Sequence, residues 1–209
     1  IPSGRKNPGV YEYKISFKGN YEGEKTLTFT ILPKAPAKIS ATQSTSVIKL
    51  SWSESVGATG YRVYRKVYGA TYYTYIETVS ADTLSYTDTG AENGKIMCYC
   101  IKAENEGSMS AYLAKCYTYV KAPEIRFSNS PSGVYLTWDK NPSAVGYWIY
   151  RKTPGAKSWT RIACVTKNYY TDTIAKSGNR YFYTVKTYTG KVLSGCNMSG
   201  WRIYYLSAP

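Results

Sequence analysis

The chain has 209 residues, which suits one or two domains, and 43% of them are hydrophobic, enough to build packed cores. It carries 27 Lys and Arg against 13 Asp and Glu, a formal net charge of +14, and it contains no histidine. The lack of histidine excludes Ser-His and Cys-His nucleophilic pairs and histidine-bearing zinc sites, and the 24 tyrosines favour β-structure.

The start of the sequence and its hydropathy indicate part of a longer protein. No window approaches the roughly 18 to 20 apolar residues of a membrane span. No basic-then-apolar signal segment is present, and the first residue is Ile1 rather than Met. We therefore expect a fragment or processed piece of a longer chain, without a membrane span of its own.

Residues 1–35 predict two antiparallel strands. Apolar residues alternate at positions 11, 13, 15 and 17 and again at 27, 29 and 31, on either side of a Gly-Asn-rich loop. Two strands alone are marginal in water, so we expect this segment to lean on the following domain or to lack its other half. The stretches 7–11, 19–23 and 26–31 resemble the C-terminal half of a bacterial Ig-like repeat.

Residues 36–122 and 123–209 read as two copies of one domain. Four blocks recur in the same order, two at a spacing of 86 residues and two at a spacing of 84. The block pairs are Ile48–Trp52 with Val134–Trp138, Gly60–Lys66 with Gly146–Lys152, Tyr86–Thr89 with Tyr170–Thr173, and Tyr99–Lys102 with Tyr183–Lys186. The linker at Pro123 leaves little slack, so we expect restricted bending between the copies.

Each copy predicts short strands rather than helices. Ile48, Leu50 and Trp52 alternate with polar residues, and turn clusters rich in Gly, Asn and Ser separate the runs. Six or seven strands in about 86 residues are typical of an antiparallel sandwich.

The motifs of each copy resemble fibronectin type III domains. They are a Trp ending the second strand, Gly-Tyr-x-Val/Ile-Tyr-Arg, Tyr-Thr-Asp-Thr and, clearest in the second copy, Tyr-x-Tyr-x-Val-Lys. The likeness is greatest to the bacterial form that ends many large surface and secreted proteins of Gram-positive anaerobes. It implies an all-β fold of two tandem immunoglobulin-like sandwiches.

The resemblance also implies roles for individual residues. Trp52 and Trp138 would fill the two cores, and Tyr181 would form the tyrosine corner of the second copy. The first copy has Met97 at that position, so the corner hydrogen bond is in doubt there. The core partners implied are Tyr61, Val63, Tyr99 and Ile101, with their counterparts Tyr147, Ile149, Tyr183 and Val185.

The acidic residues do not predict a catalytic or metal site. The only acid that recurs in both copies is Asp88/Asp172, in a Tyr-Thr-Asp-Thr turn, where capping of local backbone N–H groups explains it. No stretch clusters three carboxylates for calcium. We expect no enzyme activity, no catalytic residue, no metal site and no cofactor.

The five cysteines, an odd number, leave their pairing open. Cys98 and Cys100 form a C-x-C without a second close pair, which does not suit zinc. Cys100 and Cys116 would face each other if their hairpin centred near Ser108, so a disulfide there and free thiols are both open. The other two cysteines are Cys164 and Cys196.

The second copy predicts an outward aromatic patch. If Tyr147, Ile149, Tyr183 and Val185 point inward, strand alternation turns their neighbours outward. The expected ligand or partner face is Trp148, Tyr150, Lys152, Phe182 and Lys186, with Thr184 also outward. It would stack on sugar rings or dock a protein, unless Lys and Arg stems or a neighbouring domain cover the rings. The first copy has Arg62, Tyr64, Cys98 and Cys100 at these sites, so we expect no such patch there.

These features predict a non-enzymatic, extracellular or cell-wall-associated region of a larger bacterial protein, acting as a spacer and a protein-interaction or adhesion scaffold. The alternative is a module that binds carbohydrate or anionic cell-wall polymers, attached to a secreted enzyme or adhesin. Expected partners are other domains of the parent protein and, in the alternative, glycans, cell-wall polymers or a surface protein. The basic charge is explained by Lys guarding strand edges or by attraction to anionic polymers, and nucleic acid is not an expected partner.

Overall fold

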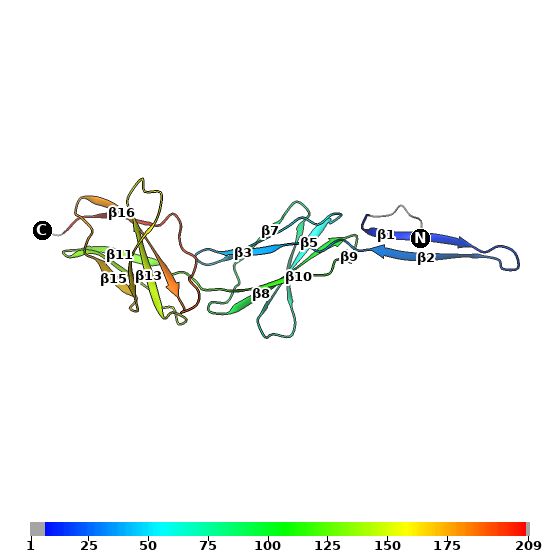
Figure 1. Ribbon diagram of the computed structural model, residues 1–209, viewed down its shortest axis with the longest axis horizontal. Coiled ribbons are helices and arrows are strands. Elements are labelled where there is room, and N and C mark those ends of the chain that lie inside the picture. The colour runs from blue at the N-terminus through cyan, green and yellow to red at the C-terminus, as the bar shows by residue number, and fades with distance from the viewer. Residues whose placement is uncertain (1–6, 208–209) are drawn as a thin grey trace. The chain divides into compact units, whose positions relative to one another are not determined.

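The computed structural model describes residues 7–207, which form seventeen β-strands and no helix (Figure 1). Within that range there is accordingly no helix that could cross a membrane. The N-terminal pair is β1 (Gly9–Ser16) and β2 (Glu24–Ile31). The first repeat contains β3 (Ile39–Gln43), β4 (Ile48–Trp52), β5 (Gly60–Val67), β6 (Thr74–Ser80), β7 (Ser85–Asp88), β8 (Ile96–Asn105), β9 (Ser108–Met109) and β10 (Leu113–Thr118). The second repeat contains β11 (Ile125–Ser130), β12 (Gly133–Trp138), β13 (Gly146–Lys152), β14 (Thr160–Val165), β15 (Tyr169–Asp172), β16 (Asn179–Tyr188) and β17 (Trp201–Tyr205).

The N-terminal strands form the predicted antiparallel hairpin. Tyr11 lies opposite Phe29 and Tyr13 opposite Leu27, so the alternating apolar residues share one face. The Phe29 ring stacks with those of Tyr11 and Tyr13, at centroid distances of 5.3 and 5.2 Å. Leu27 is still 45% exposed, as expected for a two-stranded sheet with no second layer of its own.

Each repeat has the predicted two sheets. In the first repeat the strand orders are β3-β4-β7 and β10-β8-β5-β6, with β9 paired to β8. In the second repeat they are β11-β12-β15 and β14-β13-β16-β17. The orders match at equivalent positions, as two copies of one domain require.

The two tryptophans fill the cores as predicted. Trp138 is fully buried and meets Tyr147 edge-on at 5.2 Å, within a cluster that also contains Ile149, Tyr183 and Val185. In the first repeat, Trp52 is buried and meets Tyr61 edge-on at 5.6 Å. The inward residues of β4 and β12 alternate with polar ones, so the period-two pattern identified both strands correctly.

The tyrosine corner is present in the second repeat. The hydroxyl of the buried Tyr181 accepts a hydrogen bond from the backbone N–H of Lys176 at 2.9 Å. Met97 occupies the equivalent position of the first repeat and is buried. A thioether has no hydroxyl, so the same bond cannot form there.

The contacts within the chain define two compact units whose boundaries cut through the first repeat. One unit consists of the chain up to Ser40 together with Leu50–Tyr86 and Met97–Cys116. The other consists of Ala41–Lys49, Thr87–Ile96 and the chain from Tyr117 onward. The domain boundaries at 35/36 and 122/123 therefore stay predictions from the repeat.

Candidate functional site

The residues predicted to face outward in the second repeat do share one side of the sheet β14-β13-β16-β17. Trp148 lies directly opposite Lys186, and Lys152 directly opposite Phe182. Tyr150, on the same side, lies opposite Thr184. We call this surface the cation–aromatic face and define it by Trp148, Tyr150, Lys152, Trp159, Arg161, Phe182 and Lys186.

Cations and rings contact one another throughout this face. The Arg161 guanidinium lies 4.4 Å from the centroid of the Trp148 ring. Lys152 Nζ lies 4.6 Å from the Trp159 ring and 5.5 Å from the Phe182 ring. Lys186 Nζ lies 5.7 Å from the Tyr150 ring. These are cation–π distances, so the rings hold the cations in defined places.

The same contacts cover the aromatic rings. Trp148 and Phe182 are only half-buried, but each has a cation over its ring. Trp148 also packs on Tyr188, with ring centroids 5.5 Å apart. Burial raises the pKa of the Tyr150 hydroxyl. Of the two alternatives left open by the sequence, coverage by Lys and Arg describes this face better than free rings do.

Two members of the face did not follow from strand alternation. The pairing of β13 with β14 shifts register after Ile149, where Ile162 is an extra residue, so Tyr150 lies opposite Arg161. This β-bulge brings Arg161 to the outer side. The other unpredicted member is Trp159, which precedes β14 and packs against Gly200, where an added Cβ would lie 2.4 Å from its ring. The only sequence signal was that Trp159 and Tyr73 occupy matching repeat positions.

Thr184 is on the predicted side but is buried, with 2% of its surface exposed. Strand alternation correctly predicted the side of the sheet on which Thr184 lies, but it did not predict that the side chain is buried there.

The first repeat does not repeat the aromatic patch, but it has two cation–ring pairs on the corresponding sheet. Lys66 Nζ lies 4.8 Å from the Tyr73 ring, and Lys102 Nζ lies 5.9 Å from the Tyr64 ring. These pairs occupy the positions of Lys152 with Trp159 and of Lys186 with Tyr150. Tyr73 lies outside the compared strands, and strand alternation alone does not bring Lys102 to the Tyr64 ring.

The two faces differ in charge compensation. In the first repeat, Arg62 Nε donates to Glu104 Oε2 at 2.5 Å, a bond that raises the pKa of Arg62. The equivalent positions of the second repeat hold Trp148 and Tyr188. An ion pair is thus replaced by an aromatic pair.

The cysteine arrangement also differs from the sequence prediction. Cys98, not Cys100, forms a disulfide with Cys116, and Cys98 and Cys100 are both buried although they were expected on the surface. The hairpin turns at Glu106 and Gly107, both at positive φ (44° and 80°), so Asn105 pairs with Ser108. A turn earlier than Ser108 moves Cys116 toward Cys98.

The remaining cysteines are free thiols. Cys100 and Cys196 are buried and Cys164 is exposed. Burial raises the pKa of the Cys100 thiol to about 11, so it is protonated at neutral pH.

The recurring aspartate is a structural residue. Asp172 Oδ1 accepts the backbone N–H of Ile174, and Asp88 Oδ1 accepts that of Gly90, which are the predicted turn caps. The structure adds two donors to Asp172 Oδ2, Arg151 Nη1 and the Tyr183 hydroxyl, both at 2.7 Å. Among residues 7–207 no three His, Cys, Asp or Glu side chains gather where they could hold a metal ion.

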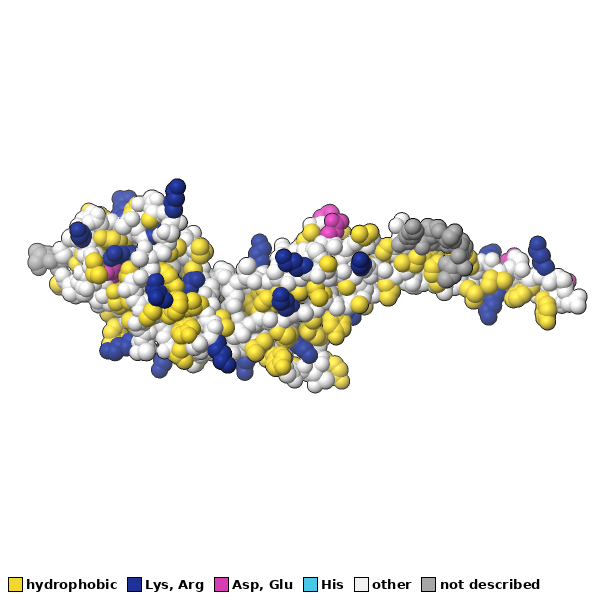
Figure 2. Space-filling view, viewed as in Figure 1, with side chains coloured by type: hydrophobic (Ala, Val, Ile, Leu, Met, Phe, Trp, Pro, Cys, Tyr) yellow, Lys and Arg dark blue, Asp and Glu magenta, His cyan; other side chains and the backbone are white. Residues whose placement is uncertain are grey.

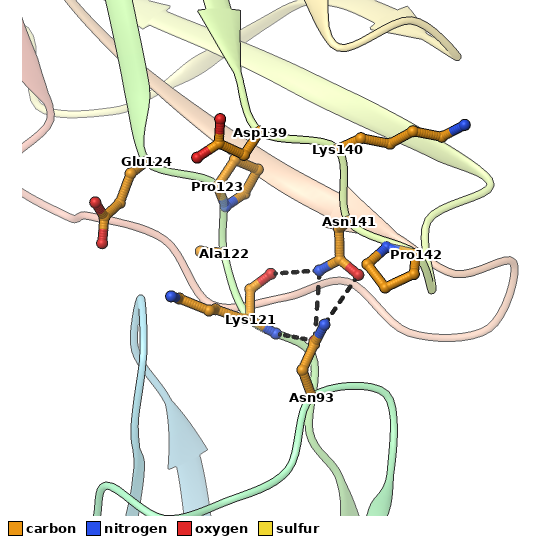
Figure 3. Close-up of a pocket in the computed structure, with 9 residues that line it drawn as sticks. All are labelled: Asn93, Lys121, Ala122, Pro123, Glu124, Asp139, Lys140, Asn141 and Pro142. Atoms are coloured by element: carbon orange, nitrogen blue, oxygen red, sulfur yellow. Dashed lines mark hydrogen bonds between the residues drawn. The ribbon is translucent and has the colours of Figure 1, made fainter.

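A second candidate region is a hollow of about 220 Å³ around the segment that connects the repeats (Figure 3). Lys121 N donates to Asn93 Oδ1 at 2.9 Å, and Asn141 Nδ2 donates to the Lys121 carbonyl at 3.1 Å. Asn93 Nδ2 also donates to Asn141 Oδ1 at 3.1 Å. The charged groups around it, Glu124, Asp139 and Lys140, are exposed, so the hollow offers no desolvated group for binding or catalysis.

Charge is spread widely over the molecule. Figure 2 shows Lys and Arg side chains scattered over the visible surface rather than gathered in one stripe, with few acidic ones between them. Residues 123–209 contain twelve Lys and Arg and only three Asp and Glu, so this part carries most of the net charge.

Comparison with known proteins gives two relatives, and no protein-family model matches the chain. One is an amylopullulanase of Thermoanaerobacterium saccharolyticum, 39% identical over 75 residues, which are 35% of this chain and 6% of the relative. The other is exoglucanase B of Cellulomonas fimi, 30% identical over 188 residues, which are 79% of this chain and 16% of the relative. The chain thus spans a small part of the length of the curated relatives it matches.

Two solved structures are similar at 16% identity. The FN1–FN3 domains of chicken CNTN1 match with a TM-score of 0.40, over 83% of this chain and 67% of that one. A two-domain fibronectin type III segment of chicken tenascin matches with a TM-score of 0.42, over 82% of this chain and 98% of that one.

The strand order of the chain itself assigns the fold. Each repeat pairs its first, second and fifth main strands in one sheet and its fourth, third, sixth and last in the other, in the antiparallel immunoglobulin-like manner. The residues from β3 to β17 form two tandem antiparallel, immunoglobulin-like β-sandwiches, which is the fold that the resemblance to fibronectin type III domains implied.

Proposed function

We propose that this chain is a non-enzymatic spacer and interaction scaffold within a larger extracellular protein. The observation that carries the proposal is that hydrogen bonds hold residues 119–122, the segment that connects the repeats. The backbone N–H groups of Tyr119, Val120, Lys121 and Ala122 all donate hydrogen bonds.

The acceptors come from several separate parts of the chain. Val120 N bonds Gln43 Oε1 at 3.0 Å, and Ala122 N bonds the Thr45 carbonyl at 2.9 Å. The Lys121 carbonyl accepts from both Asn141 Nδ2 and Thr187 Oγ1, each at 3.1 Å. A connection held at each residue transmits position and force instead of acting as a flexible joint.

The relatives support a place beside other domains. They carry enzyme names, and the chain matches only 6% and 16% of their lengths. We infer that this region is likewise attached to a larger secreted or cell-wall-associated protein, whose other domains are its first partners. The N-terminal hairpin would then be the end of a preceding Ig-like repeat.

Spin-label distances test the rigid connection. Labels at Thr42→Cys on β3 and Ser128→Cys on β11, in a Cys164→Ser background, should give one narrow distance distribution by electron paramagnetic resonance. Asn93→Ala combined with Asn141→Ala should broaden it. Asn129→Ala, an exposed Asn bonded only to the Tyr204 carbonyl, is the matched control and should leave it narrow. A broad distribution in the parent protein would refute the spacer proposal.

A further inference from the structure

The cation–aromatic face lies on a sheet without carboxylates. The strands β13, β14, β16 and β17 contain six Lys and Arg residues and no Asp or Glu. One of the six, Arg151, bonds the buried Asp172. The other five, Lys152, Arg161, Arg180, Lys186 and Arg202, form no ion pair with any residue between 7 and 207.

Three of these cations are held in place. Arg161, Lys152 and Lys186 each lie over an aromatic ring, at 4.4, 4.6 and 5.7 Å. A ring orients a cation without neutralising it, so a ligand would meet charges that have already lost part of their conformational freedom. Lys186 on β16 lies opposite Trp148 on β13, and Trp148 is four residues from Lys152 on the same strand. The two lysines are therefore about 13 Å apart along the strand direction.

The first repeat provides an internal contrast. Its corresponding sheet uses the same Lys–ring pairs but contains Glu77 and Glu104, and Glu104 neutralises Arg62. The first-repeat sheet has five Lys and Arg against these two Glu, so the excess of positive charge is larger in the second repeat, with six against none.

We propose that the cation–aromatic face of the second repeat binds an acidic polysaccharide through Lys152, Arg161 and Lys186. The face presents three positive charges on three neighbouring strands, each over an aromatic ring, and this arrangement is complementary to acidic groups repeated along a sugar chain. This inference goes beyond the spacer function and does not depend on it.

Other ligands fit the geometry less well. A neutral sugar would stack on a free ring face, and the rings of Trp148, Tyr150 and Phe182 carry cations. A four-stranded sheet is too wide for a duplex groove, which admits a helix or a two-stranded ribbon. Single-stranded nucleic acid needs uncovered aromatic platforms for its bases.

Binding of the full chain to polygalacturonate tests the proposal, with neutral dextran as the comparison polymer. The charge-removing variant is Lys152→Gln with Arg161→Gln and Lys186→Gln. The matched control, Lys49→Gln with Lys140→Gln and Lys176→Gln, removes the same charge from exposed positions outside the face. Isothermal titration at about 50 mM salt should show that the face variant binds at least about tenfold more weakly, and the control less than about threefold.

The outcomes separate the explanations. Binding to polygalacturonate but not dextran, lost in the face variant and weakened by salt, supports the site. Equal losses in both variants would mean that overall charge attracts the polymer, and no binding or equal binding to dextran would also overturn the proposal. Tighter, face-dependent binding of oligothymidylate would assign the face to nucleic acid instead. Thermal melting checks the fold of each variant, and if the triple variant unfolds, Arg161→Gln alone, at an exposed residue, must still weaken binding.

Discussion

At the residue scale, the cores are filled by a few large aromatic side chains. Trp138 is fully buried, and its indole N–H has no hydrogen-bond partner among the described residues, so its contribution comes from packing. Trp148, which follows the core residue Tyr147 in the sequence, belongs to the cation–aromatic face and lies outside the core. The two tryptophans therefore differ in place: Trp138 fills the core, and Trp148 lies on the outer side of the sheet.

Replacing Trp138 should unfold the second repeat. Trp138→Ala empties a large volume and should cost about 3 to 5 kcal/mol in urea titration. Trp138→Phe, which keeps one aromatic ring and empties a smaller volume while losing an unbonded N–H, should cost clearly less. Trp148→Ala is the surface control, and a loss below about 1 kcal/mol for Trp138→Ala would contradict the assigned packing.

Buried tyrosines should make stability fall at alkaline pH. Burial and then the hydrogen bond to Asp172 raise the pKa of Tyr183, and burial raises those of Tyr119 and Tyr170. An unfolded Tyr loses its proton near pH 10, so the stability that depends on these neutral hydroxyls is present below about pH 10 and is lost as pH rises above it.

Urea titrations at pH 9 and pH 11 would measure this loss. Tyr183→Phe removes one such hydroxyl and should reduce the loss by up to about 1.4 kcal/mol per pH unit. A Tyr183→Phe slope equal to that of the parent would mean that Tyr183 ionises freely in the folded protein.

At the element scale, strand phase could be predicted from the sequence and hairpin register could not. In β1, β2, β4 and β12 apolar and polar side chains alternate along the strand. Burial of one face of the sheet explains this alternation directly. The turn at Glu106–Gly107 and the bulge after Ile149 are backbone events with no polarity signal. They decided which cysteine pairs with Cys116 and which residue of β14 joins the face. The sequence thus indicated the sheet side of the site but missed Arg161 and Trp159.

The Cys98–Cys116 disulfide should stabilise the first repeat. The sequence comparison predicts a less stable first repeat, because Met97 replaces the corner tyrosine and strand alternation turns Cys98 and Cys100 outward. Those cysteines are buried, and a cross-link over 18 residues adds about 3 kcal/mol by restricting the unfolded chain. The disulfide therefore opposes the predicted difference in stability, in which the first repeat is the less stable one.

Calorimetry of the full chain with and without reductant should show one melting transition that moves down on reduction and one that stays. Cys116→Ser should reproduce the shift without reductant, and Cys164→Ser, at an exposed free thiol, should have no effect. Two transitions that are both insensitive to reductant would show that the cross-link does not stabilise the fold.

At the scale of the whole molecule, the N-terminal hairpin shares one compact unit with Leu50–Tyr86 and Met97–Cys116 of the first repeat. Pro8 lies so close to Gly57 that a Cβ added at residue 57 would lie 2.4 Å from its ring. Pro33 and Pro36, which join the hairpin to β3, are both buried. The hairpin thus contributes packing to the repeat that follows it.

Removing residues 1–35 should weaken the first repeat. In calorimetry of residues 36–209, the reductant-sensitive transition should fall by several degrees, because the contact at Gly57 is lost. The other transition is the internal control and should not move. An unchanged first-repeat transition would mean that the hairpin does not support it.

The disulfide also decides how far the molecule can lengthen when it is pulled from its ends. A chain stretched to full extension gains at most about 3.6 Å per residue, so the 18-residue loop closed by Cys98 and Cys116 withholds about 60 Å of contour. The second repeat has no cross-link between its described residues, so all of them can contribute to extension. The two sandwiches are alike in strand order, but under tension they would unfold to different extended lengths. The redox state of one cysteine pair would therefore change the maximum extension of the whole chain.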